Sequence, residues 1–598
     1  MDFLADAARL GIESEYVDAN GRRRQVPADV IAKVAAALRG GMVAPRNGAV
    51  PPQSAPAFAR RAYQGPPGRN WLLAVQLYGV RSQRNWGHGD FADLRALIEL
   101  AAQAGAAGVG INPLHALFDE SPEQPSPYSP NSRLFLNPLY IAVDEIPEFE
   151  ASRDAIDDEI AGLRQSELVD YAGVAALKQR HLREAYRTFV ARGAPERRAD
   201  FATFRRTRSA LTRFACFEVL RRRFGRPWWQ WPSEWRNPDE AALTRLRADA
   251  ADEIGYTEYV QWIADRQLMA CHDRAHALSL AIGLYLDVAV GVQPDGFDAW
   301  DTPDAIMRTL AVGAPPDLLN SAGQNWGLAG FSGVGLAARD FQPYRDMLRA
   351  AMRYAGAIRL DHVLGLKRLY VIPDGLRPDQ GTYVRLPFEQ MLSVAAEESV
   401  RSRCIVIGED LGTVPDGFRA QLAQWGLWSY QVMLFERDAS GAFWPPEHYA
   451  EHALATFATH DLPTFAGWVD GHDLRVKRAL HLDAGESDRA RAGAIAQLRR
   501  ALDTSAKTVD FPATLRFLAR SRAKMLVVAL DDVLGVREQA NIPGTIDQHP
   551  NWRRKLPRDL ERIGDDERLR TVARIAADAG RAPGAPGGGA AARSRNTS

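Results

Sequence analysis

Hydrophobic residues recur along the chain in short runs, most of which are followed by a stretch with helical spacing. We find eight runs of this kind: Leu72–Tyr78, Gly108–Ile111, Gly283–Val288, Ala357–Asp361, Cys404–Gly408, Tyr430–Phe435, Ala455–Thr459 and Leu526–Leu530. Strands that alternate with helices indicate a parallel sheet in an α/β protein. Eight of them predict a closed (β/α)8 TIM barrel.

The uneven spacing of the runs predicts insertions into this barrel. A long interval with helical pattern separates the second run from the third, so we expect a large, mainly helical insertion at about 145–280. The pattern predicts a second helical insertion at 472–522. The barrel with its insertions would then occupy residues 69–575.

The two ends of the chain have different patterns. Residues 1–40 carry apolar side chains at helical spacing, which predicts a short helical N-terminal segment. Residues 41–68 are rich in Pro, Ala and Gly, a composition typical of a linker. Residues 576–598 lose all periodicity, and we expect a disordered tail there.

Composition and charge narrow the class of protein. The 598 residues include 74 Lys plus Arg and 74 Asp plus Glu, a balance that argues against a nucleic-acid partner. Three cysteines are too few for a disulfide scaffold and fit a reducing compartment. We see no secretory signal and no apolar run long enough to span a membrane. These features predict a cytoplasmic protein without membrane contact, and they leave the oligomeric state open.

Carboxylates stand in or after several of the predicted strands. In a TIM barrel the active site lies at the C-terminal ends of the strands. Two carboxylates with opposite pKa shifts at one barrel mouth form the arrangement of glycosidases, in which one is the nucleophile and the other the acid/base. The candidate residues at strand ends are Asp287, Asp361, Glu409, Asp410, His460 and Asp461.

Strand alternation suggests different roles for these carboxylates. Arg359 and Asp361 share a face, so the guanidinium would lower the pKa of Asp361 and keep it ionised as a nucleophile. Glu409 and Asp410 point in opposite directions. Glu409, among apolar neighbours, would have a raised pKa that suits a general acid. Asp410 would cap a following helix.

Other interpretations stay open at this point. Each carboxylate taken alone could be a helix cap or the partner of a surface arginine, and the set favours a site only in combination. Asp461, with His460 beside it, could hold sugar hydroxyls and favour an oxocarbenium-like transition state. The sequence has no His-Glu-x-x-His run, no Walker-type loop, no dinucleotide fingerprint and no Gly-x-Ser-x-Gly elbow. A catalytic metal, a nucleotide cofactor and a serine nucleophile are therefore not indicated.

The 14 tryptophans offer a second line of inference. Sugars stack their apolar faces on aromatic rings, and aromatic residues close to Gly, Asn, Gln or Asp are candidate platforms. These are Trp86, Tyr128, Trp300, Trp326 and Trp468. We expect the cluster Trp228–Trp235 to serve packing instead.

Longer motifs run in order between residues 71 and 556 and include Asn85-Trp86-Gly87, Gln324-Asn325-Trp326-Gly327, Arg359-Leu360-Asp361-His362, Gly408-Glu409-Asp410-Leu411-Gly412, His460-Asp461-Leu462-Pro463 and Asn551-Trp552-Arg553-Arg554-Lys555. In these motifs the chain resembles the amylomaltases (4-α-glucanotransferases, or disproportionating enzymes) of the α-amylase superfamily. The bacterial maltodextrin type is the nearest in pattern.

The resemblance implies specific roles. Asp361 would be the nucleophile that forms a covalent glycosyl-enzyme intermediate, Glu409 the acid/base, and Asp461 the stabiliser of the transition state. The resemblance implies maltooligosaccharides and α-1,4-glucans as substrates, and it implies no cofactor or metal. The residues implied to contact or support the substrate are Arg359, His460, Asp287, Tyr128, Asp317, Asn325 and Trp326.

The chain departs from the family pattern in one place. Relatives of this type often carry a small β-sandwich before the barrel, and residues 41–68 are too few for a sandwich of about 100 residues. We predict a retaining 4-α-glucanotransferase. Two alternatives are an α-1,4-glucan hydrolase of the same superfamily and a non-catalytic glucan-binding protein on the same barrel.

Overall fold

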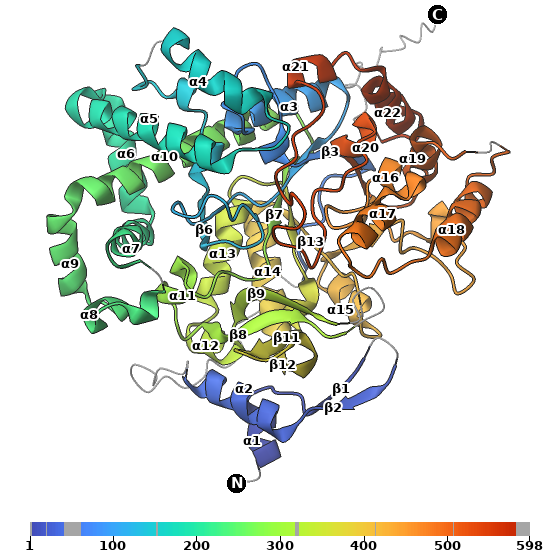
Figure 1. Cartoon of the computed structure of the whole chain (residues 1–598), viewed down its shortest axis with the longest axis horizontal. Coiled ribbons are helices and arrows are strands. Elements are labelled where there is room, and N and C mark those ends of the chain that lie inside the picture. Colours follow the sequence, from blue (N-terminus) through green and yellow to red (C-terminus); the bar gives the residue numbers. More distant parts are fainter. Residues whose placement is uncertain are drawn as a thin grey trace, which may run out of the picture.

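The protein is built around a closed barrel of eight parallel strands (Figure 1). The computed structural model describes residues 3–18, 21–40, 61–150, 153–225, 227–316, 322–412, 414–505 and 508–581. Around the barrel the strands follow the order β10-β13-β14-β15-β16-β3-β4-β7. Their bounds are β3 Asn70–Val75, β4 Gly108–Ile111, β7 Gly283–Val288, β10 Ala357–Leu360, β13 Ile405–Gly408, β14 Trp428–Val432, β15 Ala453–Thr456 and β16 Met525–Ala529. The TIM-barrel prediction is confirmed, with strand ends shifted by a few residues.

The strands are apolar on both faces because side chains fill the barrel interior and helices cover its outside. On β13, Ile405 and Ile407 belong to the inner cluster, whereas Val406 packs in the outer core. This alternation directs the next odd-numbered residue, Glu409, towards the barrel axis. The helices outside the insertions are α3 Phe91–Gln103, α11 Phe297–Asp301, α12 Gly333–Ala338, α13 Gln342–Met352, α14 Phe388–Ser402, α15 Phe418–Gln424, α20 Leu530–Leu534, α21 Leu560–Ile563 and α22 Glu567–Asp578.

Two groups of helices flank the barrel on opposite sides (Figure 1). The first follows β4, after the short strands β5 His115–Ala116 and β6 Ser132–Leu136. It contains α4 Arg153–Gln165, α5 Tyr171–Arg192, α6 Pro195–Thr207, α7 Leu211–Phe224, α8 Ser233–Arg236, α9 Glu240–Asp249 and α10 Ala251–Ala277. The second follows β15 and contains α16 Phe465–Asp470, α17 His472–Ala479, α18 Asp488–Ala501 and α19 Phe511–Ala519.

The sequence did not reveal a four-stranded sheet outside the barrel. It has the order β12-β11-β8-β9 and is formed by β8 Ile306–Ala314, β9 Gln324–Phe331, β11 Arg368–Pro373 and β12 Thr382–Arg385. These strands pair antiparallel and interrupt the βα repeats, with β8 and β9 after β7 and with β11 and β12 after β10. The motif Gln324–Gly327 lies at the start of β9.

The N-terminal segment packs beneath this outer sheet (Figure 1). The expectation that residues 1–40 are helical was incomplete, because the hairpin β1 Glu15–Val17 and β2 Arg23–Gln25 separates α1 Phe3–Arg9 from α2 Ala28–Gly40. The hairpin has no buried face, so no apolar alternation marked it. The ring of Tyr16 contacts the outer sheet, with centroids 5.9 Å from Tyr370 and 5.5 Å from Tyr383.

Part of the predicted tail is folded. Helix α22 continues to Asp578, and the fully buried guanidinium of Arg581 donates hydrogen bonds to the carbonyls of Ala519 and Ser521. The expected start of disorder at residue 576 was therefore wrong for residues 576–581. Residues 582–598, like residues 41–60 of the predicted linker, lie outside the described part of the chain. Across that described part, the structure contains no helix that is both long and apolar enough to cross a membrane.

Candidate active site

The candidate site is centred on one buried arginine at the C-terminal end of the barrel. The guanidinium of Arg359, only 7% exposed, lies 2.9 and 3.0 Å from the two carboxylate oxygens of Asp287. It also lies 2.9 Å from Oδ1 of Asp361 and 3.8 Å from Oε2 of Glu409. Strand ends that are far apart in the sequence thus place three carboxylates around one cation.

Strand register explains this convergence. In the parallel pairing of β10 with its two neighbours, Arg359 stands opposite Asp287 on β7 and opposite Ile407 on β13. Two residues further along their strands, Asp361 and Glu409 point to the same side. The backbone N–H groups of His362 and Leu411 donate to the two carboxylate oxygens of Glu409, at 2.8 and 2.9 Å, which fixes the orientation of that carboxylate.

The pKa values of the central pair differ from one sequence expectation. Burial raises the pKa of Asp361 to about 6, assisted by the charges of Glu409 and Asp287, although Arg359 opposes the shift. The predicted net lowering was therefore wrong, because burial and two like charges outweigh one guanidinium. Burial also raises the pKa of Glu409, against the opposing effect of Arg359 and the two backbone donors. At neutral pH, Asp361 remains mostly ionised.

A third carboxylate faces the mouth of the barrel. The side chain of Asp461 is 44% exposed, its Oδ2 lies 3.4 Å from Nε2 of His460, and its Oδ1 accepts a hydrogen bond of 2.6 Å from Asn541. Loss of solvent would raise the pKa of Asp461, but His460, Asn541 and Arg359 together lower it below its usual range. Asp461 is therefore an accessible carboxylate beside the central pair, and its surroundings favour the charged form.

An aromatic wall joins these groups. The hydroxyl of Tyr128 donates to Oδ2 of Asp287 at 2.6 Å, and its ring stacks on His460 with centroids 4.6 Å apart. The ring of Trp552 contacts both, at 5.4 Å from Tyr128 and 5.3 Å from His460. Sequence reasoning gave no role to Trp552 or Asn541. Their position in the motif region between residues 541 and 556 was the only available signal.

Strand β9 of the outer sheet supplies a second edge of the site. The half-buried ring of Trp326 lies edge-on to His362, 5.2 Å between centroids, and His362 follows Asp361 directly. Asn325 is exposed beside it and accepts a hydrogen bond from the N–H of Gly327 at 2.9 Å. Asp317, the remaining predicted contact, lies outside the described residues.

Several other sequence candidates serve packing. Trp86, Trp300 and Trp468 are 2–3% exposed and lie in the hydrophobic core, so the prediction that they are sugar platforms was wrong. In the cluster Trp228–Trp235, Trp231 is 1% exposed, which confirms its predicted packing role.

Asp410 is also structural, but it caps no helix. Its buried carboxylate accepts hydrogen bonds from the N–H of Tyr430 at 3.0 Å and from Arg419 at 2.8 Å. The hydrogen bond from Tyr430 thereby links β14 to the end of β13.

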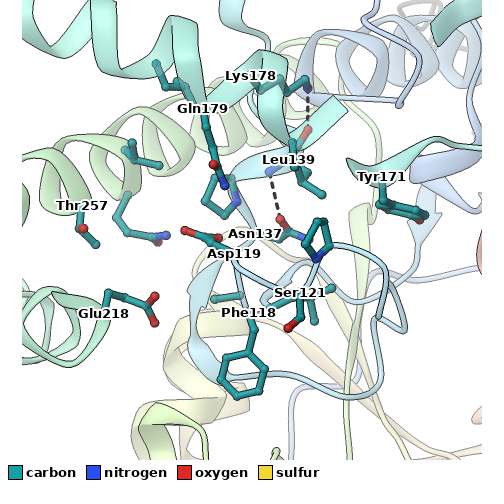
Figure 2. A pocket seen from close by; sticks show the side chains of 18 of the residues that line it. Phe118, Asp119, Ser121, Asn137, Leu139, Tyr171, Lys178, Gln179, Glu218 and Thr257 are labelled. Carbon is teal, nitrogen blue, oxygen red and sulfur yellow. Dashed lines mark hydrogen bonds between the residues drawn. The ribbon is translucent and has the colours of Figure 1, made fainter. Parts of the chain in front are cut away.

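A second acidic pocket lies apart from this cluster. Figure 2 shows it between the 117–125 loop and helices of the first insertion, with the side chains of Asp119 and Glu218 extending into it. Glu218 accepts a hydrogen bond of 2.7 Å from Asn131. Burial and the neighbouring charge of Asp119 raise the pKa of Glu218 to about 8. None of the residues around Arg359 lines this pocket. Within the described ranges, no group of three or more His, Cys, Asp or Glu side chains is placed to hold a metal ion.

Comparisons of the sequence and of the structure with known proteins agree with one another. Residues 75–561 match the sequence model of a family described as 4-alpha-glucanotransferase. The 4-alpha-glucanotransferase of Mycobacterium tuberculosis is 38% identical over 84% of this chain and 74% of its own length. The enzyme of the same name from Haemophilus influenzae is 34% identical over 86% of this chain and 79% of its own length. The crystal structure of amylomaltase from Corynebacterium glutamicum is similar with a TM-score of 0.81 and 27% identity, covering 96% of this chain and 99% of that one.

Proposed function

The chain belongs to the 4-alpha-glucanotransferase family, and we propose that Asp361, Glu409 and Asp461 perform its reaction. The activity is the transfer of α-1,4-linked glucan segments. We therefore prefer transfer to the two alternatives, a glucan hydrolase and a non-catalytic glucan-binding protein. Maltooligosaccharides are the substrates we propose. The observation that carries the assignment of residues is the contact of Arg359 with three carboxylates at 2.9–3.8 Å.

The first half of the proposed reaction breaks the donor. The ionised carboxylate of Asp361 attacks the anomeric carbon, while protonated Glu409 gives its proton to the glycosidic oxygen of the leaving chain. A covalent bond forms between Asp361 and the sugar, and the bond to the leaving oxygen breaks. The raised pKa of Glu409 favours the protonated form that this step requires, and Arg359 favours the charged form of Asp361.

The second half builds the product. The 4-hydroxyl of an acceptor glucan attacks the same anomeric carbon, Glu409 takes the hydroxyl proton, and Asp361 leaves as a carboxylate. Both halves pass through a sugar with positive charge on its ring. Asp461 is ionised and faces the mouth, so it would stabilise that charge. Asp287 and Tyr128 would hold Arg359 and His460 in place.

Transfer must outcompete hydrolysis for the covalent intermediate. The rings of Tyr128 and Trp552 on one side, and of Trp326 on the other, form apolar surfaces beside the central pair. We infer that such surfaces favour an acceptor sugar, which can stack on them, over a water molecule, which cannot.

Separation of the products formed from maltotriose tests this function. Transfer gives glucose together with oligosaccharides longer than three units, whereas hydrolysis gives shortening alone. Asp361→Asn should abolish both while the circular dichroism spectrum stays unchanged, and Asp416→Asn, on an exposed residue in the loop after β13, should retain full activity. Near-normal transfer by Asp361→Asn would overturn the residue assignment, and shortening alone by the unaltered enzyme would overturn the choice of transfer.

A further inference from the structure

Residues 79–87, in the loop after β3, and residues 555–560 meet beside the barrel, and the proposed reaction uses none of these side chains. The loop after β3 and the segment around residue 555 are joined by backbone hydrogen bonds from Leu556 N to the carbonyl of Gly79, 2.8 Å, and from Leu560 N to the carbonyl of Arg81, 2.7 Å. A Cβ atom on Gly79 would lie 2.5 Å from the carbonyl oxygen of Arg554, so this close approach needs a glycine. The two segments therefore form one fixed surface.

The C-terminal end of α4 adds a third wall. The guanidinium of Arg164 donates to the carbonyl of Asn85 at 2.6 Å and to that of Arg84 at 2.8 Å, and the ammonium of Lys555 donates to the carbonyl of Leu163 at 2.5 Å. Together the three segments line an open cavity of about 280 Å³, which we name the Arg81 pocket. Its lining includes Arg81, Gln83, Arg164, Gln165, Lys555 and Asp559.

The charges in the Arg81 pocket are unequal. Three of its lining side chains are cationic and one, Asp559, is acidic. Asp559 approaches Arg81 only to 3.6 Å, beyond hydrogen-bond distance, and in the described part of the chain no residue accepts a hydrogen bond from the Arg81 guanidinium. Lys555 and Arg164 each use only part of their donor capacity on backbone carbonyls. Donors and positive charge therefore remain available in the cavity.

Holding these cations together is unfavourable without an anion. Burial and the charge of Arg81 lower the pKa of Lys555 to about 8, although the charge of Asp170 opposes the shift, so the charged form of Lys555 is destabilised there. A bound anion would offset this repulsion and would accept the unused hydrogen bonds. A chloride ion is a single acceptor atom, whereas the donors lie on three separate side chains, Arg81, Arg164 and Lys555. A tetrahedral oxoanion with several acceptor atoms fits the cavity and the number of donors.

We propose that the Arg81 pocket binds a phosphate group, carried by inorganic phosphate or by a phosphorylated sugar. The site is separate from the catalytic cluster: the two share no lining residue, and the proposal does not depend on the roles of Asp361, Glu409 and Asp461.

Isothermal titration calorimetry on the full-length protein tests the proposal, with inorganic phosphate and with glucose 1-phosphate as separate probes in chloride buffer of constant ionic strength. We expect saturable binding at one site. Lys555→Met and Arg81→Gln should each weaken it about tenfold or more, because each removes one charge-assisted partner. Lys33→Met, on an exposed lysine of α2, is the matched control and should bind as the unaltered protein does.

The outcomes separate clearly. Tighter binding of glucose 1-phosphate than of inorganic phosphate assigns the pocket to a sugar phosphate, and equal binding assigns it to the phosphate group alone. Absence of saturable binding, or equal affinity in the unaltered protein, in Lys555→Met and in Arg81→Gln, would overturn the proposal. Arg81→Gln keeps the test decisive if Lys555→Met does not fold, because the Arg81 side chain is partly exposed and its backbone contacts are retained.

Discussion

The barrel mouth and the pocket of Figure 2 each contain acidic side chains whose pKa values are raised by burial, yet we propose catalysis only at the mouth. At the mouth, Arg359 contacts Asp361 at 2.9 Å and stands 3.8 Å from Glu409, so the two carboxylates experience different electrostatic environments. In the pocket, the amide of Asn131 holds Glu218, while the charge of Asp119 opposes its ionisation and the charge of Arg222 favours it. A raised pKa reports burial, whereas a cation fixed by strand register distinguishes a nucleophile from an acid.

Among the variants that test this comparison, Glu409→Gln should cause the largest loss of activity. The variant cannot protonate the leaving oxygen, so we expect kcat on maltotriose to fall by about 10²–10⁴. A maltosyl fluoride donor, whose leaving group needs no proton, should restore the first half-reaction. The measurement is initial rates on both donors. A loss of equal size on both donors would contradict the acid role of Glu409.

Arg359→Lys should have the next largest effect, since it keeps the charge but removes the planar fork that reaches Asp287 and Asp361 together. We expect a fall in kcat of about 10²-fold. Arg359 lowers the pKa of Asp361, which stands at about 6, so weakening this contact should raise it. The acid limb of the pH–rate profile should therefore move to higher pH. An unshifted limb in rates measured from pH 5 to 8 would contradict the role given to Arg359.

The barrel strands and the residues at their ends could largely be predicted from the sequence. The eight barrel strands are buried on both faces and bounded by turns, so their apolar runs were visible, and the strand ends identified Asp361, Glu409 and Asp461. The register of β10 with β13 then brings Asp361 and Glu409 together, and that placement needed only the barrel topology. The direction of the pKa shift of Asp361 could not be predicted, because its burial depends on every element around the mouth.

The outer elements gave weaker signals. Strand β9 alternates half-buried and exposed residues over Gln324–Gly327, a segment that was not among the predicted strands. It pairs with β8 in the outer sheet. Trp86 and Trp326 both lie next to glycine in the sequence, yet one is buried against His181 and the other lines the site. Local pattern does not distinguish them, because exposure is a property of the assembled fold.

Glu218→Gln should have the smallest effect, and it tests the other side of the comparison. The glutamine can still accept the hydrogen bond from Asn131, and Glu218 lies outside the catalytic cluster, so transfer from maltotriose should stay within about twofold of the unaltered enzyme. A large loss of activity would mean that the pocket takes part in the reaction.

The pH dependence of stability should nevertheless change in this variant. The pKa of Glu218 is about 8 in the folded protein and near 4.5 in the unfolded chain, so the folded state binds the additional proton between these values. The contribution of Glu218 to stability is therefore greatest below about pH 4.5 and is lost as the pH rises towards 8. Urea midpoints at pH 5, 6.5 and 8 should fall less steeply for Glu218→Gln than for the unaltered protein, whereas Glu196→Gln, on an exposed residue of α6, should leave the slope unchanged. Equal slopes in all three proteins would show that Glu218 is ionised in the folded state, and that the charge of Arg222, which lowers its pKa, outweighs burial and the charge of Asp119.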